Sequence, residues 1–142
     1  MATLYSDIIT NLRASPVVKP DSGQSNGKVR CDTFTWTGDA AQNDLVELCK
    51  LPIGARILYG FVDFTDFGTS VTLDIGDGTT ENKYLSALDV ATAAGTSGFA
   101  NTWALYGVGR ERLSTAITLT AKLEGANPAS GSLYGYIYYT VE

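Results

Sequence analysis

The chain has 142 residues, of which 44% are hydrophobic and 18% charged, and its formal net charge is −5. This length suits one domain with its own core, and the hydrophobic content excludes a disordered chain. Only 10 residues are lysine or arginine and they are scattered, which argues against a nucleic-acid surface because such a surface needs a basic face.

The first 27 residues differ from the rest of the chain. They begin with a short amphipathic pattern made of Leu4, Ile8, Ile9 and Leu12. Pro16, Pro20 and a polar, glycine-containing linker follow, and the stretch has too few apolar groups to fold alone. We therefore expect an N-terminal arm over residues 1–27. It either remains a mobile terminus or becomes ordered against its own domain or a neighbouring subunit.

The beginning of the chain also bears on its location. It has neither the basic segment nor the apolar segment of a signal peptide. No apolar run approaches the length of a transmembrane helix. We therefore expect a soluble protein that is made in the cytoplasm and does not associate with a membrane.

Alternation of apolar and polar residues predicts four strands in the next part of the chain, over residues 28–37, 44–50, 55–67 and 70–76. In the first strand Phe34 and Trp36 share one face. In the third, Tyr59-Gly60 predicts a bulge or a close approach of two backbones. Cys31 and Cys49 fall in the first two strands, where apolar neighbours favour buried free thiols over a disulfide.

The alternation stops after residue 76. Residues 80–93 are the best helix candidate, as a long excursion between strands, and residues 94–102 read as a loop. Further strands are predicted over 102–108, 115–123 and 132–142. The last strand places three tyrosines on one face, called here the tyrosine ladder: Tyr134, Tyr136 and Tyr138. These rings are either exposed, as an interface or a sugar platform, or half-buried under the 80–93 excursion.

Seven or eight strands separated by turn residues, with at most two short helices, define the predicted fold class. This pattern is typical of an all-β protein, built as a β-sandwich or barrel. The long excursions favour a jelly-roll-like sandwich. We therefore predict a single β-sandwich domain over residues 28–142, preceded by the extended arm.

The composition limits the chemistry. The chain has no histidine, which excludes Ser-His-Asp and Cys-His arrangements and removes the commonest metal ligand. A carboxylate pair or a calcium loop remains conceivable among the acidic residues Asp63, Asp66, Asp74, Asp77, Glu81 and Asp89, but acidic residues are also usual at strand ends and in turns. We expect no enzyme, no cofactor and no metal.

Residues 51–78, LPIGARILYGFVDFTDFGTSVTLDIGDG, resemble a pattern found in small virion proteins of tailed bacteriophages. The matching positions are Pro52, Gly54, Ala55, Arg56, Gly68, Thr72, Leu73, Ile75, Gly76 and Asp77. The pattern continues at Lys83-Tyr84-Leu85 and ends on Tyr139-Thr140-Val141-Glu142. It covers roughly residues 50–142 and leaves out the arm.

The resemblance implies a head decoration, or cement, protein that binds the major capsid protein on the capsid exterior and stabilises the shell. Such proteins are commonly trimers, so a homotrimer is expected. The candidate interface residues are Leu4, Tyr5, Ile8, Ile9, Leu12, Arg110, Arg112, Tyr134, Tyr136 and Tyr138. The alternatives are a tail or neck component of the virion and a carbohydrate-binding sandwich that uses Trp36, Trp103 and the tyrosine ladder.

Overall fold

The computed structural model describes residues 14–17, 28–100 and 112–141. The strands in these residues are β1 (Val29–Gly38), β2 (Leu45–Leu51), β3 (Ala55–Phe64), β4 (Thr72–Gly76), β5 (Leu85–Asp89), β6 (Gly95–Phe99), β7 (Ile117–Glu124) and β8 (Gly131–Val141). Within the described part of the chain, no helix is long and apolar enough to cross a membrane.

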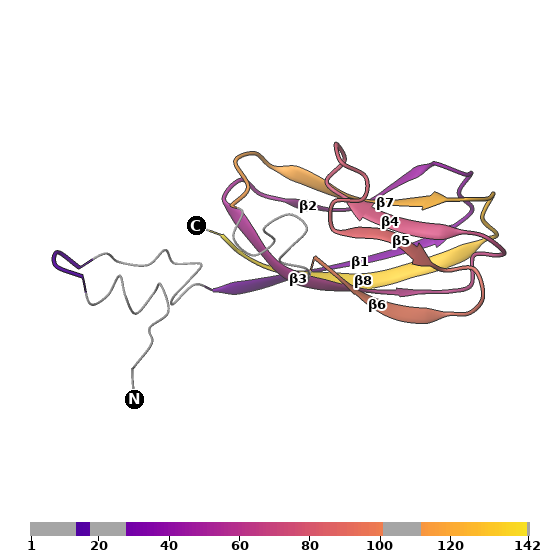
Figure 1. The fold of residues 1–142 in the computed structure, drawn as a ribbon, viewed down its shortest axis with the longest axis horizontal. Coiled ribbons are helices and arrows are strands. Elements are labelled where there is room, and N and C mark those ends of the chain that lie inside the picture. The colour runs from indigo at the N-terminus through magenta and orange to yellow at the C-terminus, as the bar shows by residue number, and fades with distance from the viewer. Residues whose placement is uncertain (1–13, 18–27, 101–111, 142) are drawn as a thin grey trace, which may run out of the picture.

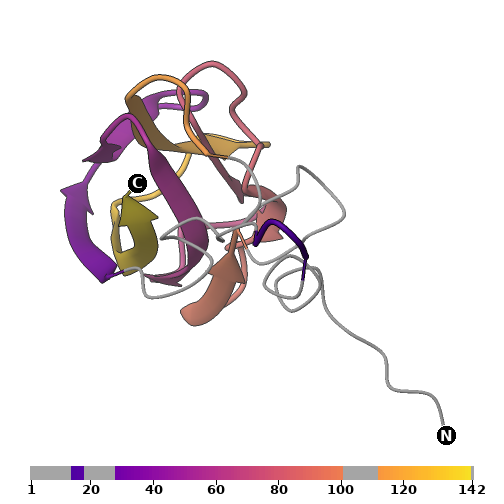
Figure 2. The same ribbon diagram turned by 90° about the vertical axis from the view of Figure 1, so that its left-hand side faces the viewer.

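The strands form two four-stranded sheets, in the orders β1-β8-β3-β6 and β2-β7-β4-β5. Strands β1, β2, β3 and β4 pair antiparallel with β8, β7, β6 and β5 respectively. This is the pairing of one long hairpin rolled into two sheets, which defines an eight-stranded jelly roll. Figures 1 and 2 show the sheets facing each other. The predicted all-β, jelly-roll-like sandwich is confirmed.

The inner faces of the two sheets form one core. Alternate residues of the central strands are fully buried there, including Leu133 and Ile137 of β8 and Leu119 and Leu123 of β7. Each such side chain contributes about 1.5–3 kcal/mol to stability by leaving water. Strict alternation on β7 and β8 therefore fixes which face of each strand points outward.

Glycines make close contacts of β3 with its two neighbouring strands, β8 and β6, possible. A Cβ at Gly135 would overlap the carbonyl oxygen of Phe61 and the ring of Phe34, and a Cβ at Gly60 would overlap the ring of Phe99. The pairing of β3 with β8 also shifts register between Ile57 and Tyr59. The bulge expected at Tyr59-Gly60 is therefore confirmed, whereas the close neighbour of Gly60 is the Phe99 ring of β6 and not a second backbone.

The helix expected over residues 80–93 is wrong, because Leu85–Asp89 is strand β5, paired with β4. Leu88 lies opposite Leu73 and Leu85 lies opposite Ile75, with a register shift between them. Ala87 takes up the extra residue with a φ of 51°. The bulge places two leucines three residues apart on one side of a strand, which imitates a helical spacing.

Two further expectations need correction. Residues 94–102 are not entirely a loop, because Gly95–Phe99 form the edge strand β6. Cys31 is exposed instead of buried, because it lies on the outward side of β1, while Cys49 is part-buried; both thiols are free. The strand expected over residues 102–108 lies entirely outside the described residues.

Candidate functional site

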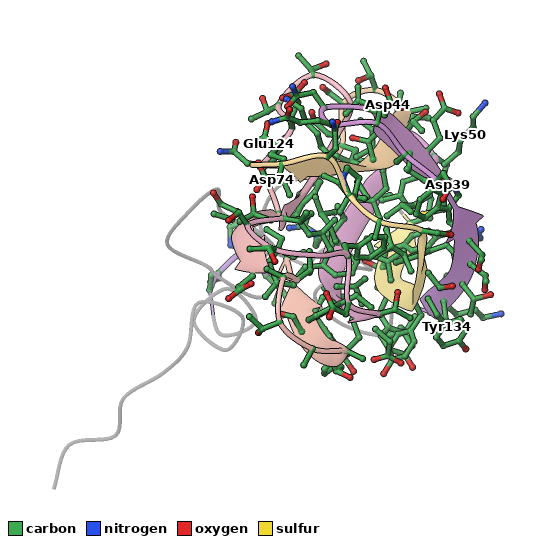
Figure 3. All side chains as sticks on the ribbon, turned by 90° about the vertical axis from the view of Figure 1, so that its right-hand side faces the viewer. Asp39, Asp44, Lys50, Asp74, Glu124 and Tyr134 are labelled. Carbon is green, nitrogen blue, oxygen red and sulfur yellow. The ribbon has the colours of Figure 1, made fainter. Side chains whose placement is uncertain are left out.

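The outer face of the β1-β8-β3-β6 sheet is the main candidate for an interaction surface, and we call it the aromatic face. Its five rings belong to Tyr59, Phe61, Tyr134, Tyr136 and Tyr138. The register places Tyr59 opposite Tyr138 and Phe61 opposite Tyr136 on the neighbouring strands β3 and β8. Figure 3 shows Tyr134 on the opposite side of the molecule from Asp44 and Glu124.

Four rings of the aromatic face pack against one another: Tyr59, Phe61, Tyr136 and Tyr138. Ring centroids are 5.1 Å apart for Tyr59 and Tyr138, 5.2 Å for Tyr136 and Tyr138, and 5.6 Å for Phe61 and Tyr136. The interplanar angles in this cluster range from 42° to 82°. These are the tilted and edge-to-face geometries that stabilise aromatic pairs, and they do not form one flat platform.

The surroundings of the rings are polar but almost uncharged. Threonines flank them on the edge strand β1, where Thr33 lies opposite Tyr136 and Thr35 opposite Tyr134. Among the described outward-facing residues between 31–37, 59–63, 96–98 and 132–138, Asp63 is the one acidic or basic side chain that is charged at neutral pH. Its Oδ1 accepts a hydrogen bond of 2.6 Å from Thr96. The face therefore offers rings and hydroxyl groups.

The outer face of the β2-β7-β4-β5 sheet, here called the charged face, has the opposite character. Lys122 of β7 lies between Glu81 and Glu124, with its Nζ 2.6 Å from a carboxylate oxygen of each. Both carboxylates raise the pKa of Lys122. Lys83 forms a further ion pair of 3.0 Å with Asp77. These charges satisfy one another.

Asp74, opposite Lys122, and Asp77, which pairs with Lys83, have pKa values shifted in opposite directions. Burial raises the pKa of Asp74, although its carboxylate accepts a 2.6 Å hydrogen bond from the N–H of Ala87. Burial also acts to raise the pKa of Asp77, but the N–H groups of Thr80 and Thr79 and the ammonium group of Lys83 outweigh it and lower that pKa. Asp77 thus organises the turn after β4.

Most of the acidic residues that the sequence singled out have hydrogen-bond or ion-pair partners within the fold. Asp66 and Asp89 each accept an N–H two residues further along the chain, as turn residues do. The carboxylate of Glu81 is held by Lys122. Within residues 14–17, 28–100 and 112–141, no group of three or more metal-ligating side chains is present. The oxygens of Asp77, around which a calcium loop is conceivable from the sequence, accept hydrogen bonds from the N–H groups of Thr79 and Thr80 and from Lys83.

The structure places some of the expected interface residues on one face of the molecule. The tyrosine ladder does lie on one outward face, but not under residues 80–93, which belong to the other sheet. Tyr59 and Phe61 complete the aromatic face and were not foreseen, although their alternation in the 55–67 strand is the signal that places them together. Trp36 is partly buried and stacks on Phe67 with ring centroids 6.3 Å apart, so it lies on the inward side of β1, away from the tyrosine ladder.

The remaining candidate residues fall into two groups. Arg112 is exposed and forms an isolated antiparallel bridge with Arg56. The others lie outside the described residues: Leu4, Tyr5, Ile8, Ile9, Leu12, Trp103 and Arg110.

No protein-family model and no curated protein matches the chain. Solved structures do match it. A chain of the Cyanophage Pam1 capsid asymmetric unit is 22% identical with a TM-score of 0.67, over 82% of this chain and 86% of that one. A chain of the capsid of Ralstonia phage GP4 is 23% identical with the same TM-score and coverage.

A chain of the capsid of Helicobacter pylori bacteriophage KHP30 is 13% identical, with a TM-score of 0.55 over 80% of this chain and 94% of that one. At these identities the likeness establishes the fold. The protein therefore has a jelly-roll sandwich of the kind present in chains from three phage capsid structures.

Proposed function

We propose that the protein is a structural component of a phage virion which binds the outer surface of the capsid and stabilises the shell. The observation that carries this proposal is the fold shared with chains of the Pam1 and GP4 capsid structures, which extends over 82% of this chain. The resemblance of residues 51–78 to small virion proteins supports it independently. The partners proposed are the major capsid protein and further copies of this chain, three being the expected number.

The physical mechanism is burial of surface across the boundaries between capsid subunits. Each Å² of apolar surface removed from water contributes about 25 cal/mol. A small domain that touches two neighbouring subunits adds its binding free energy to the cost of separating them. Because the shell repeats each contact many times, modest affinities at single sites produce a large total stabilisation.

The arm over residues 1–27 is proposed as the element that contacts the shell or a neighbouring copy. It is joined to the sandwich at Val29, which lies opposite Thr140 near the other end of the chain. Start and end of the sandwich thus lie side by side (Figure 1). An arm that leaves from one end can reach a surface without covering either outer face.

Co-sedimentation with empty capsids tests the proposal. The full chain should bind the capsids, and bound capsids should resist heat or urea better than bare ones. A chain lacking residues 1–27 should bind more weakly if the arm is the anchor. Absence of binding by the full chain would contradict the proposal, and immunogold labelling of the tail or neck would assign the protein there instead.

A carbohydrate-binding module is the second candidate, because Tyr134 is 48% and Tyr59 41% exposed. Sugars stack on exposed ring faces, whereas the ring of Tyr59 is tilted by 42° against Tyr138 and by 82° against Phe61. The geometry therefore favours a protein partner. Binding to a glycan array that is lost in Tyr134→Ser would support the carbohydrate alternative.

A further inference from the structure

The rings of the aromatic face are not needed to complete the core of one copy. They lie outside the core, which is already filled by the inner faces of both sheets. Building on the proposed function, we propose that the aromatic face is the contact between copies of this chain, so that a second copy covers it. Its exposed rings and their flanking threonines then lie near a rotational symmetry axis.

Charge favours a second copy as the occupant. Residues near a rotational axis meet the same residues of the neighbouring copy, so a charged group there meets a like charge. Each copy carries a net charge of −5, which makes most of its surface unsuitable for self-contact. Within residues 31–37, 59–63, 96–98 and 132–138, the outward side chains include Asp63 as the one that is charged, and Thr96 already donates a hydrogen bond to it. Arg56 and its bridge partner Arg112 lie beyond the rings, at the start of β3.

The chemistry of the face is self-complementary. A tyrosine combines an apolar ring with a hydroxyl that both donates and accepts a hydrogen bond. The hydroxyl groups of Thr33 and Thr35, beside the rings on β1, have the same dual capacity. Identical faces can therefore pair rings with rings and hydroxyls with hydroxyls, and nothing on the face selects a partner of opposite charge.

The area of the face is sufficient for weak association. Four strands about 4.8 Å apart, over a length of about 20 Å, present about 400 Å² of flat area, and side-chain relief adds to it. The smallest specific interfaces bury about 500 Å² on each partner. We therefore expect self-association in the micromolar range in solution, which the repeated attachment sites of a shell would strengthen.

Analytical ultracentrifugation of the full chain, from about 1 to 300 µM, tests this contact. Thr33→Glu adds a like charge to the aromatic face, and Tyr134→Ser removes its most exposed ring. Thr118→Glu is the matched control, since Thr118 points outward from β7 on the charged face. Circular dichroism and thermal unfolding confirm that each variant is folded.

The wild-type mass should rise with concentration. Thr33→Glu should weaken association at least about tenfold, because like charges meet near the axis. Tyr134→Ser should weaken it about fivefold, and Thr118→Glu should stay within about twofold of the wild type. A monomer at every concentration would overturn the inference, as would equal effects of Thr33→Glu and Thr118→Glu.

Capsid co-sedimentation separates this inference from the proposed function. A monomeric chain that still binds capsids would retain the function and overturn the contact between copies. An oligomer that is disrupted by Thr33→Glu but binds no capsid would support the contact and overturn the function. If Tyr134→Ser abolishes glycan binding without changing the mass, the face is a sugar site and the inference is wrong.

Discussion

The aromatic face carries five rings and one carboxylate, whereas the charged face carries Lys122 between Glu81 and Glu124. Both sheets contribute alternating apolar residues to the same core, so the inner sides of both must be apolar for the chain to fold. The outer sides are under no such demand. They differ in what they expose: ion pairs that satisfy one another on the charged face, and half-exposed rings on the aromatic face, which we propose a second copy covers.

Gly135→Ala should have the largest effect, because it disrupts the sheet that carries the aromatic face. The added Cβ would overlap the carbonyl oxygen of Phe61, which cannot move unless β3 and β8 separate. We expect a loss of about 3 kcal/mol in the free energy of unfolding, measured with urea. Gly38→Ala is the control, since its Cβ would lie 3.6 Å from the nearest atom of Trp36. Equal losses would contradict the packing described.

The mutual packing of the rings can be measured by a double-mutant cycle. Phe61→Ala and Tyr136→Ala remove two rings whose centroids lie 5.6 Å apart. We expect a coupling free energy of about 0.5–1.5 kcal/mol in urea unfolding, since the pair has a tilted geometry. Purely additive effects would mean that the rings do not stabilise the single copy.

On the charged face, Lys122→Met should lower the melting temperature by removing the cation shared by Glu81 and Glu124. The loss should shrink in 1 M NaCl, because salt screens the repulsion that remains between the two carboxylates. Lys50→Met, at an exposed position of β2, serves as the control and should change little. An effect of Lys122→Met that does not depend on salt would point to packing instead of charge.

Asp77 and Asp74 should give pH dependences of opposite sign. The pKa of Asp77 is lowered from 3.8, so its ionisation stabilises the fold above that pH and this contribution is lost as the pH falls. The pKa of Asp74 is raised from 3.8, so its contribution is greatest below that pH and is lost as the pH rises through the raised pKa.

Urea unfolding between about pH 7 and pH 3 measures both contributions. Asp77→Asn should be destabilised at pH 7 and should lose less stability on acidification than the wild type. Asp74→Asn should lose more on acidification. The reverse order would show that the environments of the two carboxylates are assigned wrongly.

The smallest effect concerns thiol reactivity, which reports on the faces without changing the fold. Cys31 is exposed on the aromatic side of β1, whereas burial, and then the charge of Asp32, raise the pKa of Cys49 to about 11. Iodoacetamide at pH 8 should therefore label Cys31 quickly and Cys49 slowly, as read by mass spectrometry. Labelling of Cys31 should slow as concentration rises if a second copy covers the face.

The strands with strict alternation could be predicted from the sequence, as Leu119, Ala121 and Leu123 of β7 illustrate. Strand β6 could not, because its contacts depend on aromatic rings of another strand. A Cβ at Gly95 would come within 2.9 Å of the Phe64 ring, so the position requires glycine although the residue itself disfavours strands. Strand β5 could not be predicted for the same reason, because its bulge at Ala87 is produced by its pairing with β4.

Three of the five rings of the aromatic face could be predicted in the same way. The tyrosine ladder follows from alternation within one strand, and the structure places it outward. That Tyr59 and Phe61 join it depends on the register between β3 and β8, which is set by a bulge and by Gly135. Pairing between distant strands is a property of the whole fold, so no single stretch of sequence reveals it.

Cryo-electron microscopy of empty capsids incubated with the full chain would show directly whether the protein binds the shell and which of its faces meet. We predict added density the size of this sandwich on the outer surface of the shell, with the aromatic faces of neighbouring copies turned toward a shared axis. Bare capsids at saturating protein would contradict the virion role. Bound copies that meet through the charged face, with Lys122 at the contact, would contradict the assignment of the two faces.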